Sequence, residues 1–160
     1  MPRSLFNAPN LALALAFAVP ALAQPAPAPP THAGPFDPSR DAARDFEAAK
    51  AEARRTGRRI LVDVGGNWCS WCRLLDRFYG EHKDLQALRD KHFVTLLVNY
   101  SPEQKNEALL GQFPKVKGYP HFFVLDATGK LLHSQDTGVL EDGKGYSREK
   151  MAAFLKAWKG

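Results

Sequence analysis

The first regular pattern of apolar and polar residues along the chain is helical. Four apolar residues recur every three or four positions: Ala42, Phe46, Ala49 and Ala53. Asp37 and Pro38 stand in the order of an N-cap and a first-turn proline, and Gly57 is a common helix stop. The pattern therefore predicts a helix that begins after Asp37, ends at Gly57 and has one apolar face.

Short apolar runs rich in branched and aromatic residues follow, and they have the composition of buried strands. Three of them are RILVDV at 59–64, FVTLLVN at 93–99 and HFFVLD at 121–126. A fourth run, KLLHSQ at 130–135, is separated from the third by Ala-Thr-Gly, which is short enough for a hairpin. The sequence therefore predicts four strands, and the last two form an antiparallel pair.

Helical periodicity separates these strands. It follows the first strand in CRLLDRFYG at 72–80, and a shorter helical piece is expected around residues 84–91. The tetrapeptide SPEQ predicts another helix, because Ser101 is a good cap, proline follows in the first turn and Gln104 completes a capping box. This helix is expected to end before Pro114.

A last helix follows Ser147, which is a good N-cap. Four apolar residues share one of its faces: Met151, Phe154, Leu155 and Trp158. From Arg59 onward the predicted order is β-α-β-α-β-β-α. Such an order predicts a central sheet that is parallel at first, is closed by an antiparallel hairpin and is covered by helices on both faces. The fold class is therefore α/β, with an extra helix on the N-terminal side.

Residues 1–36 differ in composition from the rest of the chain. Residues 1–23 are typical of an export signal, with one cation at Arg3, the apolar run LALALAFAV and a small-x-small cleavage pattern that ends at Ala23. An uncleaved membrane anchor is the alternative, although the apolar stretch is shorter than the roughly 20 residues that a spanning helix needs. Residues 24–36 are rich in proline and alanine and predict an extended or disordered tether, so the folded domain is expected to comprise residues 37–160.

The composition fits one ordinary globular domain. Apolar residues make up 44% of the chain, and the formal net charge of +5 falls to +4 if Arg3 is removed with the signal. No basic run is interleaved with aromatic residues, so the sequence does not indicate a nucleic-acid-binding surface. An export signal places the chain in a periplasmic or secreted environment, where oxidising conditions allow stable disulfides.

The chain contains two cysteines, which stand two residues apart in GGNWCSWCRLL at 65–75. As a structural staple the pair is weak, because closing so short a loop stabilises a fold by only about 2 kcal/mol. A zinc site needs two further ligands, and none of the five histidines stands at a finger-like spacing from the cysteines. Haem attachment needs histidine at position 73, which is arginine. The pattern therefore favours a redox pair, and the sequence implies no metal or other cofactor.

The predicted strand and helix on either side of the pair favour this chemistry. Two cysteines at i and i+3 in the first turn of a helix share one face and lie close enough to form a disulfide. Cys69 at the helix start lies at the positive end of the helix dipole, beside unpaired amides, which favours its thiolate. We therefore predict that Cys69 is the attacking nucleophile, and that Cys72, one turn deeper, resolves the mixed disulfide.

From Arg59 to about Trp158 the chain resembles the thioredoxin family in three separate segments. ILVDVGGNWCSWCR resembles the family's strand, turn and helix around its cysteines, VKGYPHFFVLD resembles the loop that places a cis-proline against the disulfide, and DTGVL resembles the glycine turn after the hairpin. The resemblance implies a thioredoxin fold and thiol-disulfide exchange. Ser-Trp at 70–71 stands where ordinary thioredoxins have Gly-Pro, and Gly-Gly at 65–66 replaces bulkier residues, so the redox potential stays open.

The resemblance also assigns roles around the cysteines. It implies that Asp63 is a carboxylate buried beneath the disulfide, with a pKa raised by burial, that takes the proton of Cys72; a surface aspartate at a strand edge is the alternative. Pro120 would be the cis-proline facing the sulfurs, or otherwise an ordinary trans turn. The backbone of Tyr119 would then pair with an extended substrate segment.

Three further residues are implied at the surface that meets the substrate. Trp68 and Trp71 would form an apolar rim for the target peptide, although both could instead be core aromatics. Gly138 would be the glycine of the turn after the hairpin. The segment VLEDGKGY at 139–146 is longer than the family's usual turn, and its glycines predict a mobile surface loop.

The sequence thus predicts an exported, monomeric thiol-disulfide oxidoreductase that acts on cysteine-containing proteins and has no nucleic-acid partner. The resemblance favours a reductant that a membrane thiol electron donor recharges, and a disulfide oxidase or isomerase is the first alternative. A non-catalytic module that uses the same fold to bind a peptide or a soft metal ion is the second.

Overall fold

A computed structural model describes residues 34–160 of the chain. The export signal predicted over residues 1–23 and the first part of the predicted tether, residues 24–33, lie outside the described residues. Within residues 34–160, none of the helices combines the length and the apolar character that crossing a membrane requires.

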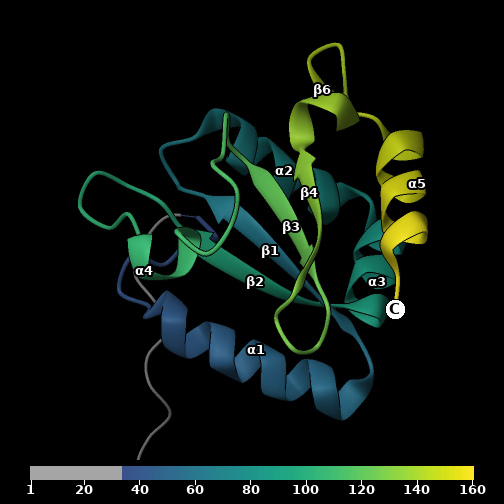
Figure 1. Ribbon diagram of the computed structural model, residues 1–160. Coiled ribbons are helices and arrows are strands. Elements are labelled where there is room, and N and C mark those ends of the chain that lie inside the picture. The colour runs from purple at the N-terminus through teal and green to yellow at the C-terminus, as the bar shows by residue number, and fades with distance from the viewer. Residues whose placement is uncertain (1–33) are drawn as a thin grey trace, which may run out of the picture.

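A four-stranded mixed sheet forms the centre of the fold, with its strands in the order β2-β1-β3-β4 (Figure 1). The strands are β1 (Arg59–Gly65), β2 (Phe93–Asn99), β3 (His121–Leu125) and β4 (Leu131–Asp136). β1 pairs parallel with β2 and antiparallel with β3, and β3 forms a hairpin with β4. The predicted sheet, parallel at first and closed by an antiparallel hairpin, is confirmed.

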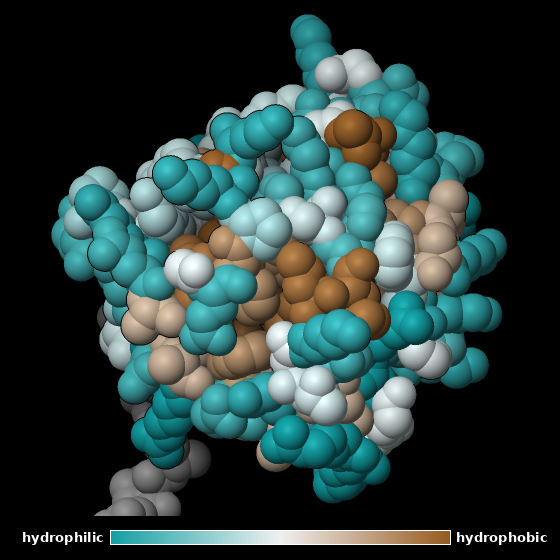
Figure 2. Space-filling model, viewed as in Figure 1, coloured by the Kyte–Doolittle hydropathy of each residue, from teal (hydrophilic) through white to brown (hydrophobic). Residues whose placement is uncertain are grey.

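Helices cover both faces of the sheet, as predicted. They are α1 (Ala42–Thr56), α2 (Ser70–Glu81), α3 (Lys83–His92), α4 (Glu107–Leu110) and α5 (Arg148–Trp158). Side chains alternate along the buried strand β1: Ile60 and Val62 pack with α1 and α4, whereas Leu61 packs with α2, α3 and α5. Figure 2 shows apolar side chains gathered near the middle of one face of the molecule, bordered by polar residues.

Helix α1 begins at Ala42, later than the sequence predicts. Asp41 is its N-cap, and the carboxylate of Asp41 accepts hydrogen bonds from two backbone N–H groups of the first turn (3.0 and 3.1 Å). The Asp37 carboxylate instead accepts the N–H of Ser39 (2.8 Å), which forms a turn ahead of the helix. The predicted apolar face is buried, and Gly57 ends the helix with a left-handed φ of 72°.

The helix predicted from Ser101 does not begin there. Between residues 101 and 113 the chain is helical only over Glu107–Leu110. Ser101 and Gln104 close a turn in which each donates its backbone N–H to the carbonyl of the other (2.9 and 3.1 Å). The side chain of Gln104, which a capping box requires, accepts a hydrogen bond from Asn99 and donates one to the carbonyl of Arg40. The Ser101 hydroxyl still accepts the N–H of Gln104 (3.2 Å), as a cap would, but the glutamine side chain does not reach back to complete the capping box.

The segment predicted as a mobile surface loop, residues 139–146, has secondary structure: it forms the end of a 3-10 helix and a short hairpin. A short 3-10 helix, η1 (Thr137–Leu140), leads into β5 (Glu141–Asp142) and β6 (Gly145–Tyr146), which pair with each other. The side chain of Tyr146 is buried in the core against α2 and α5. Ser147 follows directly and caps α5 through its hydroxyl, which accepts the N–H of Lys150, as the sequence predicts.

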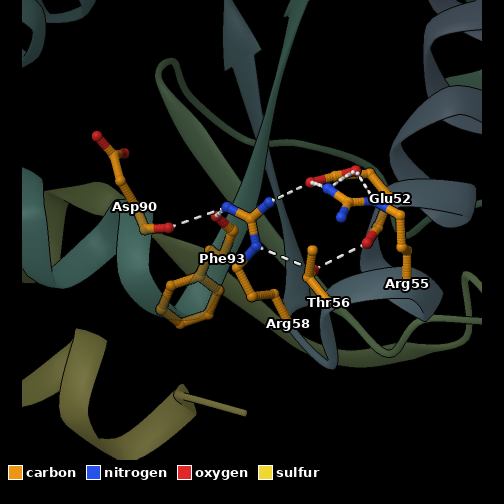
Figure 3. Close-up of polar contacts among 6 residues, drawn as sticks. All are labelled: Glu52, Arg55, Thr56, Arg58, Asp90 and Phe93. Atoms are coloured by element: carbon orange, nitrogen blue, oxygen red, sulfur yellow. Dashed lines mark hydrogen bonds and ion pairs between the residues drawn. The ribbon is translucent and has the colours of Figure 1, made fainter.

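An arginine network fixes the end of the sheet where β1 and β2 begin (Figure 3). Arg58, between α1 and β1, donates hydrogen bonds to four groups: the Glu52 carboxylate, the Thr56 hydroxyl and the carbonyls of Asp90 and Phe93. These bonds tie the last turn of α1 to the junction of α3 and β2. The two cysteines follow the opposite end of β1, where the chain turns into α2.

Asp41→Ala is expected to destabilise the protein by about 1 kcal/mol, because two N–H groups at the start of α1 lose their acceptor. Urea unfolding followed by circular dichroism measures the change. Asp41→Asn, which keeps a capping oxygen, serves as the matched control and is expected to stay within a few tenths of a kcal/mol of the wild type. Equal stability of Asp41→Ala and the wild type would show that the helix start is capped elsewhere.

Candidate active site

The two cysteines lie at the carboxyl end of β1, where the chain turns into α2. Cys69 is the N-cap of α2, and its Sγ accepts a hydrogen bond from the N–H of Cys72 (3.1 Å). Two further bonds hold the turn: Cys69 N–H donates to the carbonyl of Gly66 (3.0 Å), and the guanidinium of Arg73 donates to the carbonyl of Asn67 (2.6 Å). A sulfur thus occupies the position that a serine or aspartate oxygen usually holds at a helix start.

Cys69 and Cys72 are joined in a disulfide, with their Cα atoms 5.2 Å apart. Cys69 is 6% exposed and Cys72 is 2% exposed, so Cys69 is the more accessible of the two residues. An incoming thiol or thiolate therefore reaches Cys69 first. This order is compatible with the predicted roles of attacking and resolving cysteine.

The Tyr119–Pro120 loop faces the disulfide. The peptide bond between these residues is cis, and the carbonyl oxygen of Tyr119 lies 3.5 Å from the Sγ of Cys69. The Pro120 side chain is buried at the start of β3. The hydroxyl of Thr137, which comes from η1, donates a hydrogen bond to the Pro120 carbonyl (2.5 Å) and so holds the loop from behind.

Asp63 is a buried carboxyl behind the disulfide. It lies on β1 and lines a cavity of about 210 Å³ together with Cys72. Its Oδ1 is buried and has no hydrogen-bond partner among the described residues. Burial raises the pKa of Asp63 to about 7, although the positive charge of Arg89 lowers it in part and the carboxylate of Asp76 adds to the increase. The carboxyl is therefore able to gain and lose a proton near neutral pH.

Trp68 forms an exposed aromatic wall beside Cys69. Its indole is 56% exposed and donates a hydrogen bond to the Tyr100 carbonyl (2.6 Å). Trp68 also meets the ring of Tyr119 edge to face (5.7 Å between centroids), and Tyr119 stacks on Tyr100 (4.9 Å). A groove of about 640 Å³ runs along this wall and is lined by Trp68, Tyr100, Ser101, Pro102, Glu103 and Lys105. The position of Trp68 suits the predicted rim.

Trp71 differs from Trp68, because it packs inward. Its ring is half-buried, meets Tyr146 edge to face (5.6 Å between centroids) and contacts both the main core and the disulfide cluster. Tyr146 belongs to the β5–β6 hairpin, so this hairpin supports the dipeptide between the cysteines. Trp71 is thus partly a core aromatic, and its predicted role in the substrate rim stays a prediction.

Gly138 lies in η1, where its N–H donates to the Asp136 carboxylate (2.9 Å). None of the contacts found within residues 34–160 places Gly138 against the disulfide. Its neighbour Thr137 makes the connection to Pro120 instead, and the sequence analysis did not identify Thr137. Its place directly before the glycine of the expected turn is the signal that could have found it.

The two glycines before the cysteines allow neighbouring groups of the site to pack closely against the backbone. A methyl group at Gly65 would lie 2.6 Å from the Sγ of Cys72 and 3.0 Å from the Cζ of Phe36. A methyl group at Gly66 would lie 2.9 Å from the Tyr100 carbonyl and would also overlap the Trp68 indole. Glycine is therefore required at both positions for close packing around the disulfide, which accounts for the Gly-Gly pair in the sequence.

Phe36, Asn67, Tyr100 and Arg89 also contribute to the site, although the sequence analysis singled out none of them. Phe36 is buried in the same cluster as the two cysteines, and Arg89 lines the cavity of Asp63. Phe36, Tyr100 and Arg89 reach the site through tertiary contacts. Asn67, directly before the Trp-Cys pair, was the one with a local signal. Over the described part of the chain, no three His, Cys, Asp or Glu side chains gather in a group that could hold a metal ion.

The strand order β2-β1-β3-β4, with a two-cysteine turn between β1 and α2, defines a thioredoxin-fold protein with a disulfide site. A family model described as thioredoxin-like matches residues 41–127, more than half of the chain. This chain belongs to the thioredoxin-like family, which confirms the resemblance found in the sequence.

Known proteins similar to this chain include disulfide-exchange proteins. It is 28% identical over 116 residues to the thiol:disulfide interchange protein DsbD of Pseudomonas fluorescens, an alignment that spans 71% of this chain and 18% of that relative's length. It is similar to the crystal structure of a disulphide isomerase from Xylella fastidiosa, with 28% identity, a TM-score of 0.67 and coverage of 77% of this chain and 95% of that one. The oxidised C-terminal domain of Neisseria meningitidis DsbD shares the fold, with 17% identity, a TM-score of 0.55 and coverage of 74% and 97%.

Asp63→Asn is expected to stabilise the oxidised protein more at pH 8 than at pH 5. Folding raises the pKa of this carboxyl to about 7, so the folded state binds its proton more tightly, and stability falls as the pH rises from about 4 to about 7. Asparagine does not titrate, so the advantage of the variant should grow between pH 5 and pH 8 by on the order of 2 to 3 kcal/mol.

Urea unfolding of the two oxidised proteins at both pH values measures this difference. Asp142→Asn, at an exposed position in β5, is the matched control and should give the same small change at each pH. A pH-independent difference between Asp63→Asn and the wild type would mean that Asp63 titrates near its ordinary pKa.

Proposed function

We propose that this protein is an exported thiol-disulfide oxidoreductase that exchanges disulfides with cysteine-containing proteins. The observation that carries the proposal is the position of the Cys69 sulfur, which caps α2, is bonded to Cys72 and lies against the Tyr119 carbonyl. A disulfide that only stabilised the fold would need neither this loop nor a buried carboxyl behind it. The similarity to DsbD and to a disulphide isomerase supports the same class of reaction.

In the reduced protein, Cys69 is the attacking thiolate. The N–H of Cys72 points at its sulfur (3.1 Å), and the positive end of the α2 dipole adds to the stabilisation of negative charge there. The thiolate attacks one sulfur of a substrate disulfide, a bond forms between Cys69 and that sulfur, and the substrate's other sulfur leaves as a thiolate that takes a proton from solvent.

Cys72 then resolves the mixed disulfide. Its thiol proton passes to the carboxylate of Asp63 across the shared cavity, and the new thiolate attacks the Sγ of Cys69. The substrate sulfur leaves as a second thiolate and is protonated. The protein has then lost two electrons to the substrate, whose disulfide has become two thiols, and the Cys69–Cys72 disulfide has formed.

The substrate approaches along the aromatic wall beside Cys69. The exposed indole of Trp68 and the ring of Tyr119 provide apolar contact for an extended peptide around the reacting cysteine. We expect the backbone of Tyr119, next to the cis bond, to pair with that peptide in the manner of an added strand. The substrate contact that the resemblance implies for Gly138 stays a prediction.

We propose reduction as the direction of physiological exchange. Oxidants of this class owe their high potential to a stabilised reduced state, that is, to stabilised thiolate. Here the Asp63 carboxylate shares a cavity with Cys72, and above its pKa of about 7 its negative charge opposes a second negative charge nearby. A membrane thiol electron donor would recharge the pair, in keeping with the export signal predicted over residues 1–23.

Disulfide isomerisation is the second candidate, and the similarity to the Xylella fastidiosa disulphide isomerase favours it. The equilibrium redox potential separates the two functions. A value near the roughly −270 mV of thioredoxin supports the reductant, one near the roughly −180 mV of protein disulfide isomerase supports isomerisation, and one near about −120 mV indicates an oxidant. Equilibration of the protein with dithiothreitol or glutathione buffers measures the redox potential of the Cys69–Cys72 pair.

Cys69→Ser is expected to abolish disulfide exchange, whereas Cys72→Ser is expected to accumulate mixed disulfides with partner proteins, because attack occurs and resolution does not. Non-reducing electrophoresis of both variants after incubation with a disulfide-bonded protein measures this. Equal trapping by the two variants would contradict the assigned roles.

Wild-type protein provides the control for this experiment, since it should cycle between dithiol and disulfide without accumulating adducts. Failure of the wild type to cycle with a dithiol donor would overturn the enzymatic proposal. In that case the non-catalytic module that binds a peptide or a soft metal ion would be the better account.

A further inference from the structure

Phe36 lies against the back of the disulfide, although it comes from the segment before α1. Its side chain is 2% exposed and belongs to the same buried cluster as Cys69 and Cys72. Phe36 and its neighbour Pro35 also line the cavity that contains Asp63 and Cys72. One wall of the cavity is therefore built by a segment that precedes the first helix and lies outside the matched family region, residues 41–127.

The side chain of Asn67 holds this segment through the backbone N–H and carbonyl of Phe36. The Asn67 Oδ1 accepts the N–H of Phe36 (3.1 Å), and its Nδ2 donates to the carbonyl of Phe36 (2.6 Å). Gly34, with a φ of 116°, packs so closely on Asn67 that a side chain there would overlap the amide. Because Asn67 belongs to the turn that leads to Cys69, the segment is fixed to the active-site turn itself.

The ring of Phe36 fills space that the Gly65 position leaves open. A methyl group at Gly65 would meet both the Cζ of Phe36 and the Sγ of Cys72, so the tip of the ring and the resolving sulfur approach the same point. The other groups that face the cavity come from three elements: Leu75, Asp76 and Tyr79 on α2, Arg89 on α3, and Thr95 and Leu97 on β2. Phe36 thus forms the wall of the cavity next to Cys72.

We propose that Phe36, latched by Asn67, is a positioning residue that shields Cys72 and Asp63 from bulk water on one side of the cavity they share. This inference rests on the proposed function and deepens it. With the wall in place, the thiol of Cys72 exchanges its proton with Asp63, and small reagents do not reach its sulfur. Without the wall, solvent hydrates the Asp63 carboxyl and competes for the same proton.

The experiment uses the full chain in a Cys69→Ser background, where Cys72 is the one remaining thiol. Phe36→Ala is expected to raise the rate of Cys72 alkylation by iodoacetamide by about tenfold or more, because the sulfur no longer requires local opening to be reached. It is also expected to lower the pKa of Asp63, measured by carboxyl NMR, because the ionised form becomes hydrated.

Two further variants test the wall and its latch separately. Phe36→Leu restores an apolar side chain and should bring the alkylation rate back to within a few-fold of the background rate. Asn67→Ala removes both latch bonds, keeps the Phe36 ring and should increase alkylation in the same direction as Phe36→Ala. These variants keep the test decisive if Phe36→Ala folds poorly.

Phe46→Ala is the matched control, because Phe46 is a buried phenylalanine of the core on the α1 face, away from the disulfide cluster. It removes the same side chain and should leave Cys72 protected and the Asp63 pKa unchanged. The proposal is overturned if Phe36→Ala and Phe46→Ala give the same alkylation rate, or if Phe36→Leu behaves like Phe36→Ala. None of these measurements needs turnover, so they stand apart from the cycling test of the proposed function.

Discussion

The hydrogen bond from the Cys72 N–H to the sulfur of Cys69 is the interaction on which the site depends. It makes a sulfur the cap of α2, so the first turn of the helix itself sets how the two cysteines face each other. The helix start is in turn fixed by β1, which is buried on both faces and delivers the turn at Gly65. The redox pair therefore takes its geometry from the core of the protein, and a site supported in this way is more precise than one on a free loop.

Close packing around the Cys69 cap explains several features of the site that come from separate parts of the sequence. Gly65 and Gly66 have no side chain because the Phe36 ring, the Cys72 sulfur and the Trp68 indole occupy the space around them. Thr137 reaches across from η1 to hold the Pro120 carbonyl, and Tyr146 supports Trp71 from the β5–β6 hairpin. Elements far apart in sequence thus converge on a few residues at one end of β1.

The sequence was most informative where local physics decides the structure. The continuous apolar runs of β1 and β2 and the apolar faces of α1 and α5 predicted those elements, because burial follows directly from their patterns. The helix expected at Ser101 failed because Asn99 and Arg40 bind the glutamine that would have capped it. The cysteine pair was evident from its spacing, whereas the role of Asp63 came from the family resemblance. The sequence did not indicate a role for Phe36, because its contact with Asn67 is tertiary.

The latch between Asn67 and Phe36 and the position of Gly160 place the two ends of the described chain at opposite ends of β1. The chain enters beside the disulfide, whereas Gly160 packs against Arg59 at the start of β1 and its carbonyl lies 3.2 Å from a ring nitrogen of His92. Seven residues of β1 separate these two points, which corresponds to about 20 Å. A cargo joined to the carboxyl terminus would therefore stand clear of the reactive face, while one joined close ahead of Gly34 would crowd it.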